Sequence, residues 1–375
     1  MQANTFTDLN TSPRTLLGPG PSMVPPRVLR AMATPLVGHL DPEFLKIMEE
    51  EQRLLRFLFQ TDNELTLAVP GTGMAGMETA LCNFIEPGDA VLVVIIGFFG
   101  ERLYEVARRY TANVDRLEFP WGQVADVAQV EAKLKEKPYK LLALVHAETS
   151  TGALQPGIPE IAAAAHAGGA LLVLDTVTSL GGIPVEIDRW GVDVAYSATQ
   201  KSLSCPPGLA PFTASERARL ALRSRKTPVA NWYLDLNGLE KYWFEPHAYH
   251  HTSAISTHFA LREGLRIVAE EGLDERFARH RANAEMFWDG LDALDLSPLV
   301  PPANRLATLT TPQVPAFADD AQVRRRLLDE YNIEIAGGFG PLKGKVWRVG
   351  LMGFSSRPEN IRLLLSALGE ILQRA

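Results

Sequence analysis

The sequence predicts an α/β protein with a mostly parallel central sheet in a large domain, followed by a smaller C-terminal α+β domain. Short apolar runs alternate with amphipathic helical stretches through the middle of the chain. Runs such as VLVVII at 91–96 and LLVLD at 171–175 are apolar without alternation, which is typical of strands covered on both faces. After about residue 255 two long helical patterns take over, which indicates a second unit. A chain of 375 residues is long enough for both.

Each predicted element follows from its local pattern. The strands expected in the large domain are 65–69, 90–96, 114–119, 141–145, 171–175 and 192–196. The helices expected between them are 74–85, 100–110, 127–136 and 158–167. The later part is expected to hold helices 256–271, 273–294, 321–331 and one from Pro358, with strands 307–311 and 345–351.

The predicted domain division has three parts: an N-terminal arm at 1–20, the large domain at 21–270 and the small domain at 271–375. The proline-rich stretch LLGPGPSMVPP, from residue 16, predicts an extended segment. The chain shows no internal repeat and no low-complexity tract. The expected order is thus a short extended arm, then the large domain, then the small domain.

Composition narrows the class of function. A net charge of −7 argues against a nucleic-acid or anionic-membrane partner. The longest apolar run, 90–99, is too short to span a bilayer, and residues 1–13 lack the pattern of a signal peptide. Cys82 and Cys205 fall in core-like segments without metal-ligand spacing, so neither a disulfide framework nor a metal site is expected. We expect a cytoplasmic protein.

Lys201 and Asp175 are the first candidates for chemistry. Lys201 follows an apolar strand, and Asp175 ends the doubly covered strand LLVLD, so both should lie at the carboxyl edge of the sheet, where ligands of open α/β sheets bind. A desolvated lysine can form a Schiff base, and a strand-end carboxylate can keep the ring nitrogen of pyridoxal phosphate protonated. A surface lysine and a helix-capping aspartate are the simpler alternatives.

A phosphate site and a ring-stacking group complete the hypothesis. The segment PGTGMAGMETAL follows a strand and opens a helix, so the N–H groups of Thr72, Gly73 and Met74 could bind a dianion there. A tight turn without ligand is the alternative. Phe98 or Phe99 could stack on the cofactor ring, although a pair of phenylalanines more often packs in the core.

Taken together, these segments make the chain resemble the class V, fold-type I pyridoxal-phosphate aminotransferases, in particular the alanine–glyoxylate and serine–pyruvate group. The resemblance runs from residue 16 to the segment WRVGLMG at 347. The motifs that carry it are LLGPGPS, GTGMAGMETAL, HAETSTG, LDTVTSLGG, SATQKSLSCPPG, YHHT and the segment of Arg348. Seven motifs in register are a specific signal.

The resemblance implies a role for each matching residue. Lys201 would carry the cofactor and shuttle the substrate proton, while Asp175 would pair with the pyridinium nitrogen. The resemblance assigns the remaining cofactor contacts to Thr72, Gly73, Met74, Phe99, Thr149, Gln200, Tyr249 and Thr252. Tyr249 and Thr252, in YHHT, match residues that reach the neighbouring subunit's phosphate, so a homodimer with shared sites is implied.

On the substrate side, Arg348 matches the arginine that grips the α-carboxylate, where the alternative is a surface ion pair. Gly20 and Gly38 fall in segments that line the substrate in this family. No catalytic task is expected for His250 or His251, which could be solvated loop residues. His146 is expected to be a hydrogen-bonded histidine near the core.

Two positions depart from the family pattern. Phe99 stands where the animal members carry Trp, and Met74 where they carry His. Phenylalanine still stacks, but with less area and no N–H, while Met74 can offer only its backbone N–H. These differences put the substrate preference in doubt rather than cofactor binding.

The implied function is ping-pong transamination between alanine or serine and glyoxylate or pyruvate, with alanine–glyoxylate exchange as the leading expectation. No second arginine clearly matches a side-chain carboxylate, which favours small substrates. The alternatives are a serine–glyoxylate, serine–pyruvate, (S)-ureidoglycine–glyoxylate or phosphonate aminotransferase, and a catalytically silent relative. A cysteine desulfurase is discounted because Cys205 lies only four residues after Lys201.

Overall fold

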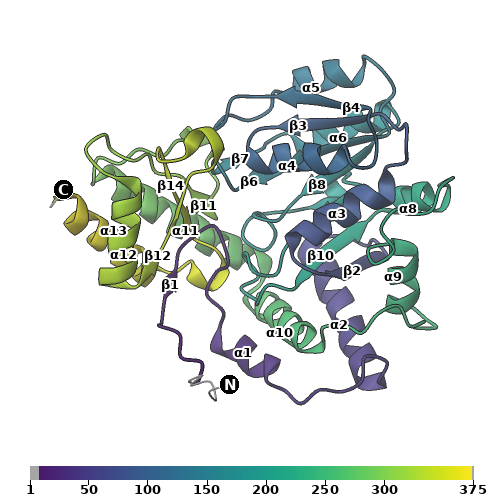
Figure 1. The fold of residues 1–375 in the computed structure, drawn as a ribbon, viewed down its shortest axis with the longest axis horizontal. Helices are drawn as coiled ribbons and strands as arrows, with labels where there is room; N and C mark the ends of the chain where they lie inside the picture. The colour runs from purple at the N-terminus through teal and green to yellow at the C-terminus, as the bar shows by residue number, and fades with distance from the viewer. Residues whose placement is uncertain (1–7, 374–375) are drawn as a thin grey trace, which may run out of the picture.

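The computed structural model describes residues 8–373 and contains a seven-stranded central sheet. Its strands lie in the order β2-β10-β9-β8-β5-β3-β4 (Figure 1). Their bounds are β2 Leu65–Pro70, β3 Val91–Ile95, β4 Val114–Glu118, β5 Leu141–Val145, β8 Leu171–Asp175, β9 Val194–Tyr196 and β10 Leu209–Ala214. The strands β9, β8, β5, β3 and β4 are mutually parallel, and β10 runs antiparallel to both β2 and β9. The predicted mostly parallel sheet is confirmed.

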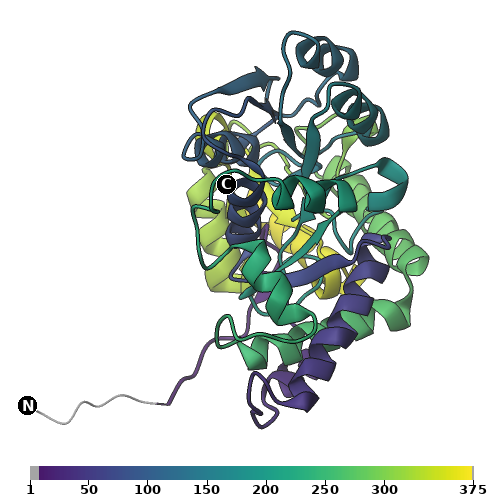
Figure 2. The ribbon, with the colours of Figure 1, turned by 90° about the vertical axis from the view of Figure 1, so that its right-hand side faces the viewer.

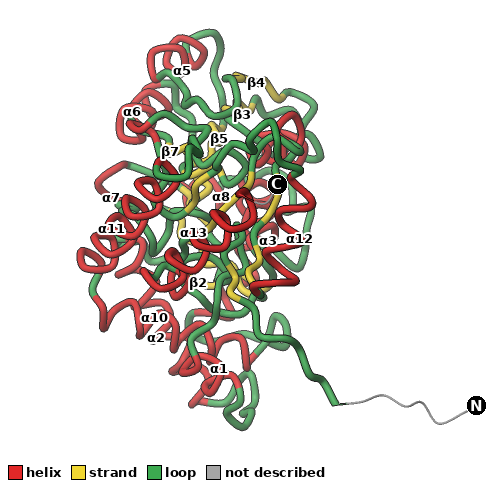
Figure 3. Tube along the Cα trace, turned by 90° about the vertical axis from the view of Figure 1, so that its left-hand side faces the viewer, coloured by secondary structure: helices red, strands yellow, loops and turns green. Residues whose placement is uncertain are grey.

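Helices cover both faces of the sheet. In Figure 3, α6 and α3 lie on opposite sides of the strands, and they pack on β8 and β9 respectively. Helices of this part are α1 Pro26–Met32, α2 Pro42–Phe59, α3 Gly73–Phe84, α4 Phe98–Ala107, α5 Val127–Leu134, α6 Ile158–Ala167, α7 Ile187–Trp190, α8 Glu216–Arg223, α9 Leu236–Trp243 and α10 Ile255–Glu271. Figure 2 shows the purple helices α1 and α2 at the lower end of the molecule, where both pack against α10.

The C-terminal elements form a second layered unit beside the sheet (Figure 1). A three-stranded sheet of order β11-β14-β13 packs with long helices. The elements are α11 Leu273–Asp292, β11 Leu309–Thr310, α12 Asp320–Tyr331, β12 Ile333–Glu334, β13 Ala336–Gly337, β14 Trp347–Gly350 and α13 Pro358–Gln373, with 3-10 turns Pro302–Asn304 (η1), Gly340–Leu342 (η2) and Gly353–Ser355 (η3). A small hairpin of β6 Ala147–Glu148 and β7 Ala153–Leu154 lies between the two units, because β6 contacts α4 and Ala153 forms a β-bridge with Arg305.

The N-terminal segment belongs to the C-terminal unit. Strand β1 (Thr15–Leu16) pairs in parallel with β12, and Leu17 is fully buried in the hydrophobic cluster of that unit. Residues 1–7, the first part of the expected arm, lie outside the described residues. The chain then passes through Pro19 and Gly20 on its way to α1. This path brings the N-terminal segment next to the carboxyl ends of the central strands.

The structure also corrects several element predictions. Strands 141–145 and 171–175 have the expected bounds, but the strand expected at 192–196 is only Val194–Tyr196. Strand β10 and helices α1, α2, α7, α8 and α9 had not been predicted. Among the described residues, no helix combines the length and apolarity that a bilayer crossing needs.

Candidate active site

Asp175 ends β8 and lies buried at the carboxyl edge of the sheet. Its two carboxylate oxygens accept hydrogen bonds from the Val177 N–H (2.9 Å) and the Tyr196 hydroxyl (2.7 Å). Burial raises the pKa of Asp175 to about 6, although both hydrogen bonds oppose this rise. Burial therefore destabilises the ionised form of Asp175, and a cationic group bound beside it would stabilise that form.

Lys201 lies in the turn after β9, and its amine donates a hydrogen bond to the carbonyl oxygen of Pro19. The Ser22 hydroxyl donates to the Lys201 carbonyl oxygen (2.7 Å), which fixes the turn from the N-terminal segment. Burial and the positive charge of Arg348 lower the pKa of Lys201 to about 8, against the opposing effect of Asp175. About a tenth of the amine is thus unprotonated at pH 7.

Gly20 packs directly on Lys201. A Cβ added at Gly20 would come within 2.7 Å of both the Cδ and the Nζ of Lys201, and φ is +111° there. Only glycine meets both requirements without strain. The predicted site residue Gly20 is therefore brought together with Lys201.

The turn between β2 and α3 offers an anion site beside these residues. A Cβ at Gly73 would lie 3.0 Å from the Cβ of Ala198 and 3.3 Å from the Cγ2 of Val177, so the N-terminus of α3 lies against the chain that follows Asp175 and precedes Lys201. Thr72 takes the N-cap position, and no described side chain caps this end of the helix. Helix N-termini with free N–H groups bind phosphate.

The buried Oε1 atom of Gln200 lacks a hydrogen-bond partner among the described residues. A phosphate group only accepts hydrogen bonds, so Gln200 would meet it through its side-chain amide N–H groups and not through Oε1. Together with the free backbone N–H groups at the start of α3, Thr72, Gly73 and Gln200 therefore fit a phosphate-bearing group. Met74 is partly exposed, with a side-chain exposure of 38%, so its contribution would be its backbone N–H.

Arg348, on β14, is 95% buried but has no carboxylate partner within the described chain. Its Nε donates to the Gly337 carbonyl oxygen (2.8 Å), while its Cζ lies 3.8 Å from the ring centre of Phe339. Burial lowers the pKa of Arg348 to about 10, so the guanidinium stays charged at neutral pH. A fixed, desolvated guanidinium with free η nitrogens suits bidentate binding of a carboxylate.

Aromatic rings connect Arg348 to the cofactor side. Phe339 lies 4.7 Å from the ring of Phe98, which meets Phe99 edge-on at 5.5 Å. Phe99 is half-buried against the main hydrophobic cluster. The pair thus packs with neighbouring rings, as the core-packing alternative expects, while stacking of Phe99 on a cofactor ring stays a prediction.

Glu148 is a buried acid that sequence reasoning had not selected. Its carboxylate accepts from the Ser150 N–H (3.0 Å) and hydroxyl (2.6 Å) and lies 3.4 Å from the N–H groups of Phe99 and Gly100. Its charge raises the pKa of Asp175 and opposes the lowering at Arg348. The acid in the motif HAETSTG was the available signal.

Thr149, the next residue, exchanges a hydrogen bond between its hydroxyl and that of Thr178. This contact ties the turn of the β6–β7 hairpin to the turn that follows Asp175. Thr149 is therefore brought to the same edge of the sheet as the other predicted cofactor residues.

Two further side chains that position the site, those of Tyr196 and Arg276, could not be predicted from the sequence. Tyr196 meets Asp175 through the register of β8 and β9, in which the two residues are paired. Arg276 donates from Nη2 to the Ser202 carbonyl oxygen (2.5 Å) and from Nε to that of Gly181 (2.7 Å). It thereby anchors the turn of Lys201 to α11. Neither contact has a local sequence signal.

Three predicted residues lie elsewhere on the chain. Gly38 and Thr252 are exposed, and Tyr249 is 65% exposed. The ring of Tyr249 lies 5.4 Å from that of His39. No hydrogen bond or ring contact within residues 8–373 joins these three to Lys201, so one chain alone does not bring them into the site.

The histidine expectations need correction. His250 and His251 are buried rather than solvated, with their Nδ1 atoms 2.9 Å apart. His146 is buried as expected, but its Nδ1 has no hydrogen-bond partner among the described groups. No cluster of potential metal ligands occurs in the described part of the chain, and Cys82 and Cys205 are both buried free thiols.

Comparison with known proteins places the chain in a family. The family model described as aminotransferase class-V matches residues 15–344. The (S)-ureidoglycine–glyoxylate transaminase of Bacillus subtilis is 42% identical over 98% of this chain and 92% of its own length. The alanine–glyoxylate aminotransferase of Oryctolagus cuniculus is 41% identical, over 97% of this chain and 94% of its own.

Solved structures agree with this placement. The crystal structure of an alanine–glyoxylate aminotransferase from Nostoc sp. superposes with a TM-score of 0.96 at 51% identity and covers 98% of both chains. The ureidoglycine–glyoxylate aminotransferase structure from Bacillus subtilis gives 0.96 at 43% identity, covering 98% of this chain and 95% of that one. The chain is an aminotransferase and belongs to the class-V aminotransferase family.

Proposed function

We propose that this enzyme transfers an amino group from a small amino acid, with alanine as the leading donor, to glyoxylate. The observation that carries the proposal is that Lys201 lies close enough to both Asp175, at the end of β8, and Arg348, on β14 of the small sheet, for their charges to shift its pKa. The relatives named above support the acceptor, because glyoxylate stands in the names of both the alanine and the ureidoglycine enzymes.

The proposed cofactor is pyridoxal phosphate, which when bound supplies an electron sink for the bonds of the substrate α-carbon. Thr72, Gly73, Met74 and Gln200 would hold its phosphate. Asp175 would keep the ring nitrogen protonated, Phe99 would cover a ring face, and Thr149 would lie near the phenolic oxygen.

Lys201 performs the proton transfer in this proposal. Its lowered pKa of about 8 leaves a usable fraction of free amine at neutral pH, which can accept the proton from the substrate α-carbon. Because the Ser22 and Arg276 contacts fix its turn, the same amine stays in place to return the proton. Pro19 offers a carbonyl oxygen that holds the side chain between these events.

Arg348 orients both substrates by their shared α-carboxylate. Its free η nitrogens can form a bidentate pair, and its Phe339 neighbour excludes water from one face. Among the described residues the other buried arginines, Arg219 and Arg276, are both paired with glutamates, so neither is free to bind a side-chain carboxylate, which supports small substrates. Serine and pyruvate remain compatible with this geometry.

A second candidate is (S)-ureidoglycine as donor. The 42% identity to the Bacillus subtilis transaminase favours it, since that value is close to the 41% of the rabbit enzyme. The two donors differ in the side chain, not in the carboxylate that Arg348 would bind. Donor competition therefore has to decide between them.

The assembly proposed is a homodimer with shared sites. Trp232, Tyr233 and Tyr249 are exposed aromatic side chains, at 68%, 44% and 65%, and large exposed aromatic groups indicate an interface. In a dimer, Tyr249, Thr252 and Gly38 would complete the partner's site.

Residues 21–270 and 271–375 are proposed as the two domains, supported by the separate hydrophobic clusters. The compartment proposed is the cytoplasm, supported by the two free thiols.

The test is direct. The holoenzyme is mixed with L-alanine, L-serine or (S)-ureidoglycine, each with glyoxylate, and glycine formation is measured together with the visible absorbance. We expect alanine to bleach the cofactor band and to give the highest kcat/KM. Lys201→Ala should abolish turnover, while Lys135→Ala, an exposed lysine, should leave it unchanged. Turnover in Lys201→Ala would refute the proposed role, and a preference for ureidoglycine would move the donor to the second candidate.

A further inference from the structure

A cavity of about 610 Å³ opens between the large sheet and the C-terminal unit. Its walls come from β7, the start of α6, the turn at Ile183, α7, α11 and η1. None of Lys201, Asp175 and Arg348 lines it. Figure 3 shows α6, α7 and α11 along one side of the molecule. This interdomain pocket is distinct from the site described above.

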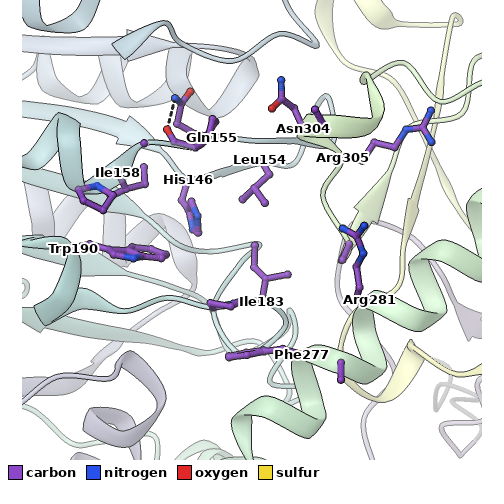
Figure 4. A pocket seen from close by; sticks show the side chains of 17 residues that line it. His146, Leu154, Gln155, Ile158, Ile183, Trp190, Phe277, Arg281, Asn304 and Arg305 are labelled. Atoms are coloured by element: carbon purple, nitrogen blue, oxygen red, sulfur yellow. Dashed lines mark hydrogen bonds between the residues drawn. The ribbon is translucent and has the colours of Figure 1, made fainter. Parts of the chain in front are cut away.

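One end of the pocket is apolar and contains an unpartnered imidazole. Figure 4 shows His146 among Leu154, Ile183 and Trp190. His146 is 96% buried, and its Nδ1 has no hydrogen-bond partner among the described groups. Burial lowers the pKa of His146 to about 3, so the ring is neutral and offers one donor and one acceptor.

The other end carries positive charge. Arg281, on α11, and Arg305, after η1, lie together at this end (Figure 4). Both guanidinium groups lie over the ring of Trp288, with the Cζ atoms of Arg281 and Arg305 at 5.4 and 5.6 Å from the ring centre. Arg281 pairs with Glu285 (2.5 Å), whereas Arg305 donates only to the Val300 carbonyl oxygen (3.0 Å) and has no acidic partner in the described chain. All lining residues are described, and none is acidic.

We propose that this interdomain pocket is a binding site for a small aromatic monocarboxylate. The ring of such a ligand would bury against Trp190, Leu154 and Ile183, and a polar ring atom would satisfy His146. Its carboxylate would form an ion pair with the guanidinium of Arg305, whose η nitrogens would donate hydrogen bonds to it. The volume falls within the range of small-molecule sites, which combine an apolar lining with a few polar groups.

The test uses indole-3-carboxylate and its uncharged analogue indole-3-carboxamide, titrated calorimetrically into the holoenzyme. We expect the carboxylate to bind at least about tenfold more tightly, because a charge-assisted hydrogen bond contributes that much or more. Arg305→Gln should remove this preference. The matched control is Arg325→Gln, because Arg325 is an exposed arginine on α12.

A second variant tests the pocket without touching a charge. Ala278 lines the cavity from an exposed position on α11, so Ala278→Trp should fill the cavity and abolish binding. Aminotransferase activity should persist in Ala278→Trp and Arg305→Gln, which shows that both fold. Absence of carboxylate binding to the unmodified enzyme overturns the proposal, as does unchanged binding in Ala278→Trp. Binding that is lost in Arg348→Gln but kept in Ala278→Trp would assign the ligand to the substrate site and also overturn it.

Discussion

Replacing Asp175 with asparagine is expected to stabilise the cofactor-free protein at alkaline pH while it removes catalytic activity. The structure buries Asp175 and raises its pKa from 3.8 to about 6. Asparagine has the same shape, can still accept from Val177, and can donate to the Tyr196 hydroxyl oxygen. The substitution thus removes a buried charge without creating a cavity.

The size of the effect follows from the pKa difference. Below pH 3.8 the carboxyl group is protonated in both the folded and the unfolded chain, so it contributes no pH dependence. Between pH 3.8 and about 6 the unfolded chain releases this proton first, so the free energy of unfolding falls as pH rises. Above pH 6 the loss is complete and amounts to about 3 kcal/mol, at 1.36 kcal/mol for each pKa unit. For a chain of this length that corresponds to about 4 °C in Tm.

Differential scanning calorimetry of the two apoproteins at pH 8 and at pH 4 measures the effect. We expect Asp175→Asn to melt at the higher temperature at pH 8, with the difference shrinking toward pH 4. Asp62→Asn, at an exposed position, is the control and should show no such trend. A variant that melts at or below the unmodified apoprotein at pH 8, or a difference independent of pH, would refute the reasoning.

Three further predictions concern the same site. The rate at which apoprotein takes up pyridoxal phosphate should rise with pH around a midpoint near 8, because only the free amine of Lys201 reacts; stopped-flow absorbance that is flat across this range would contradict it. Arg348→Gln should raise KM for both amino and oxo acids by about 10- to 100-fold while the Kd for the cofactor stays unchanged, and a loss confined to kcat would contradict the binding role. Gly20→Ala should lower kcat sharply, because its Cβ would meet the Lys201 amine at 2.7 Å; Gly18→Ala, whose nearest new contact is 3.9 Å, is the control, and equal activity of the two variants would show that the contact is unimportant.

The sequence predicted the doubly covered strands well because their signal is local. Apolar runs such as 141–145 and 171–175 end at the residues where β5 and β8 end. Strand β10 was missed because Pro211 stands in its middle, and proline lacks the N–H that a central strand normally donates. Helix α2 was missed although Asp41 caps it and Pro42 begins it.

The residues of the candidate site likewise fall into those with a local sequence signal and those without one. Asp175, Lys201 and the turn at Gly73 could be predicted because strand ends and glycine turns have local patterns. The partners Tyr196, Glu148 and Arg276 depend on strand register and on packing between distant segments, which no single stretch of sequence encodes. Tyr249 and Thr252 stay predictions, since their expected role requires a second chain.

The pairing of the first strand with the C-terminal unit has a consequence for how the chain is made. Arg14 and Asn332, which flank the β1–β12 pair and are hydrogen-bonded (2.7 Å), lie 318 positions apart. At ribosomal rates of roughly 5–20 residues per second, about 15 seconds to a minute separate the synthesis of these two partners. During that interval the segment that carries Pro19 and Gly20 has no strand to pair with, and Lys201 emerges before its neighbours are anchored. The large sheet can form during translation, but the surroundings of Lys201 are completed only when almost the whole chain has left the ribosome.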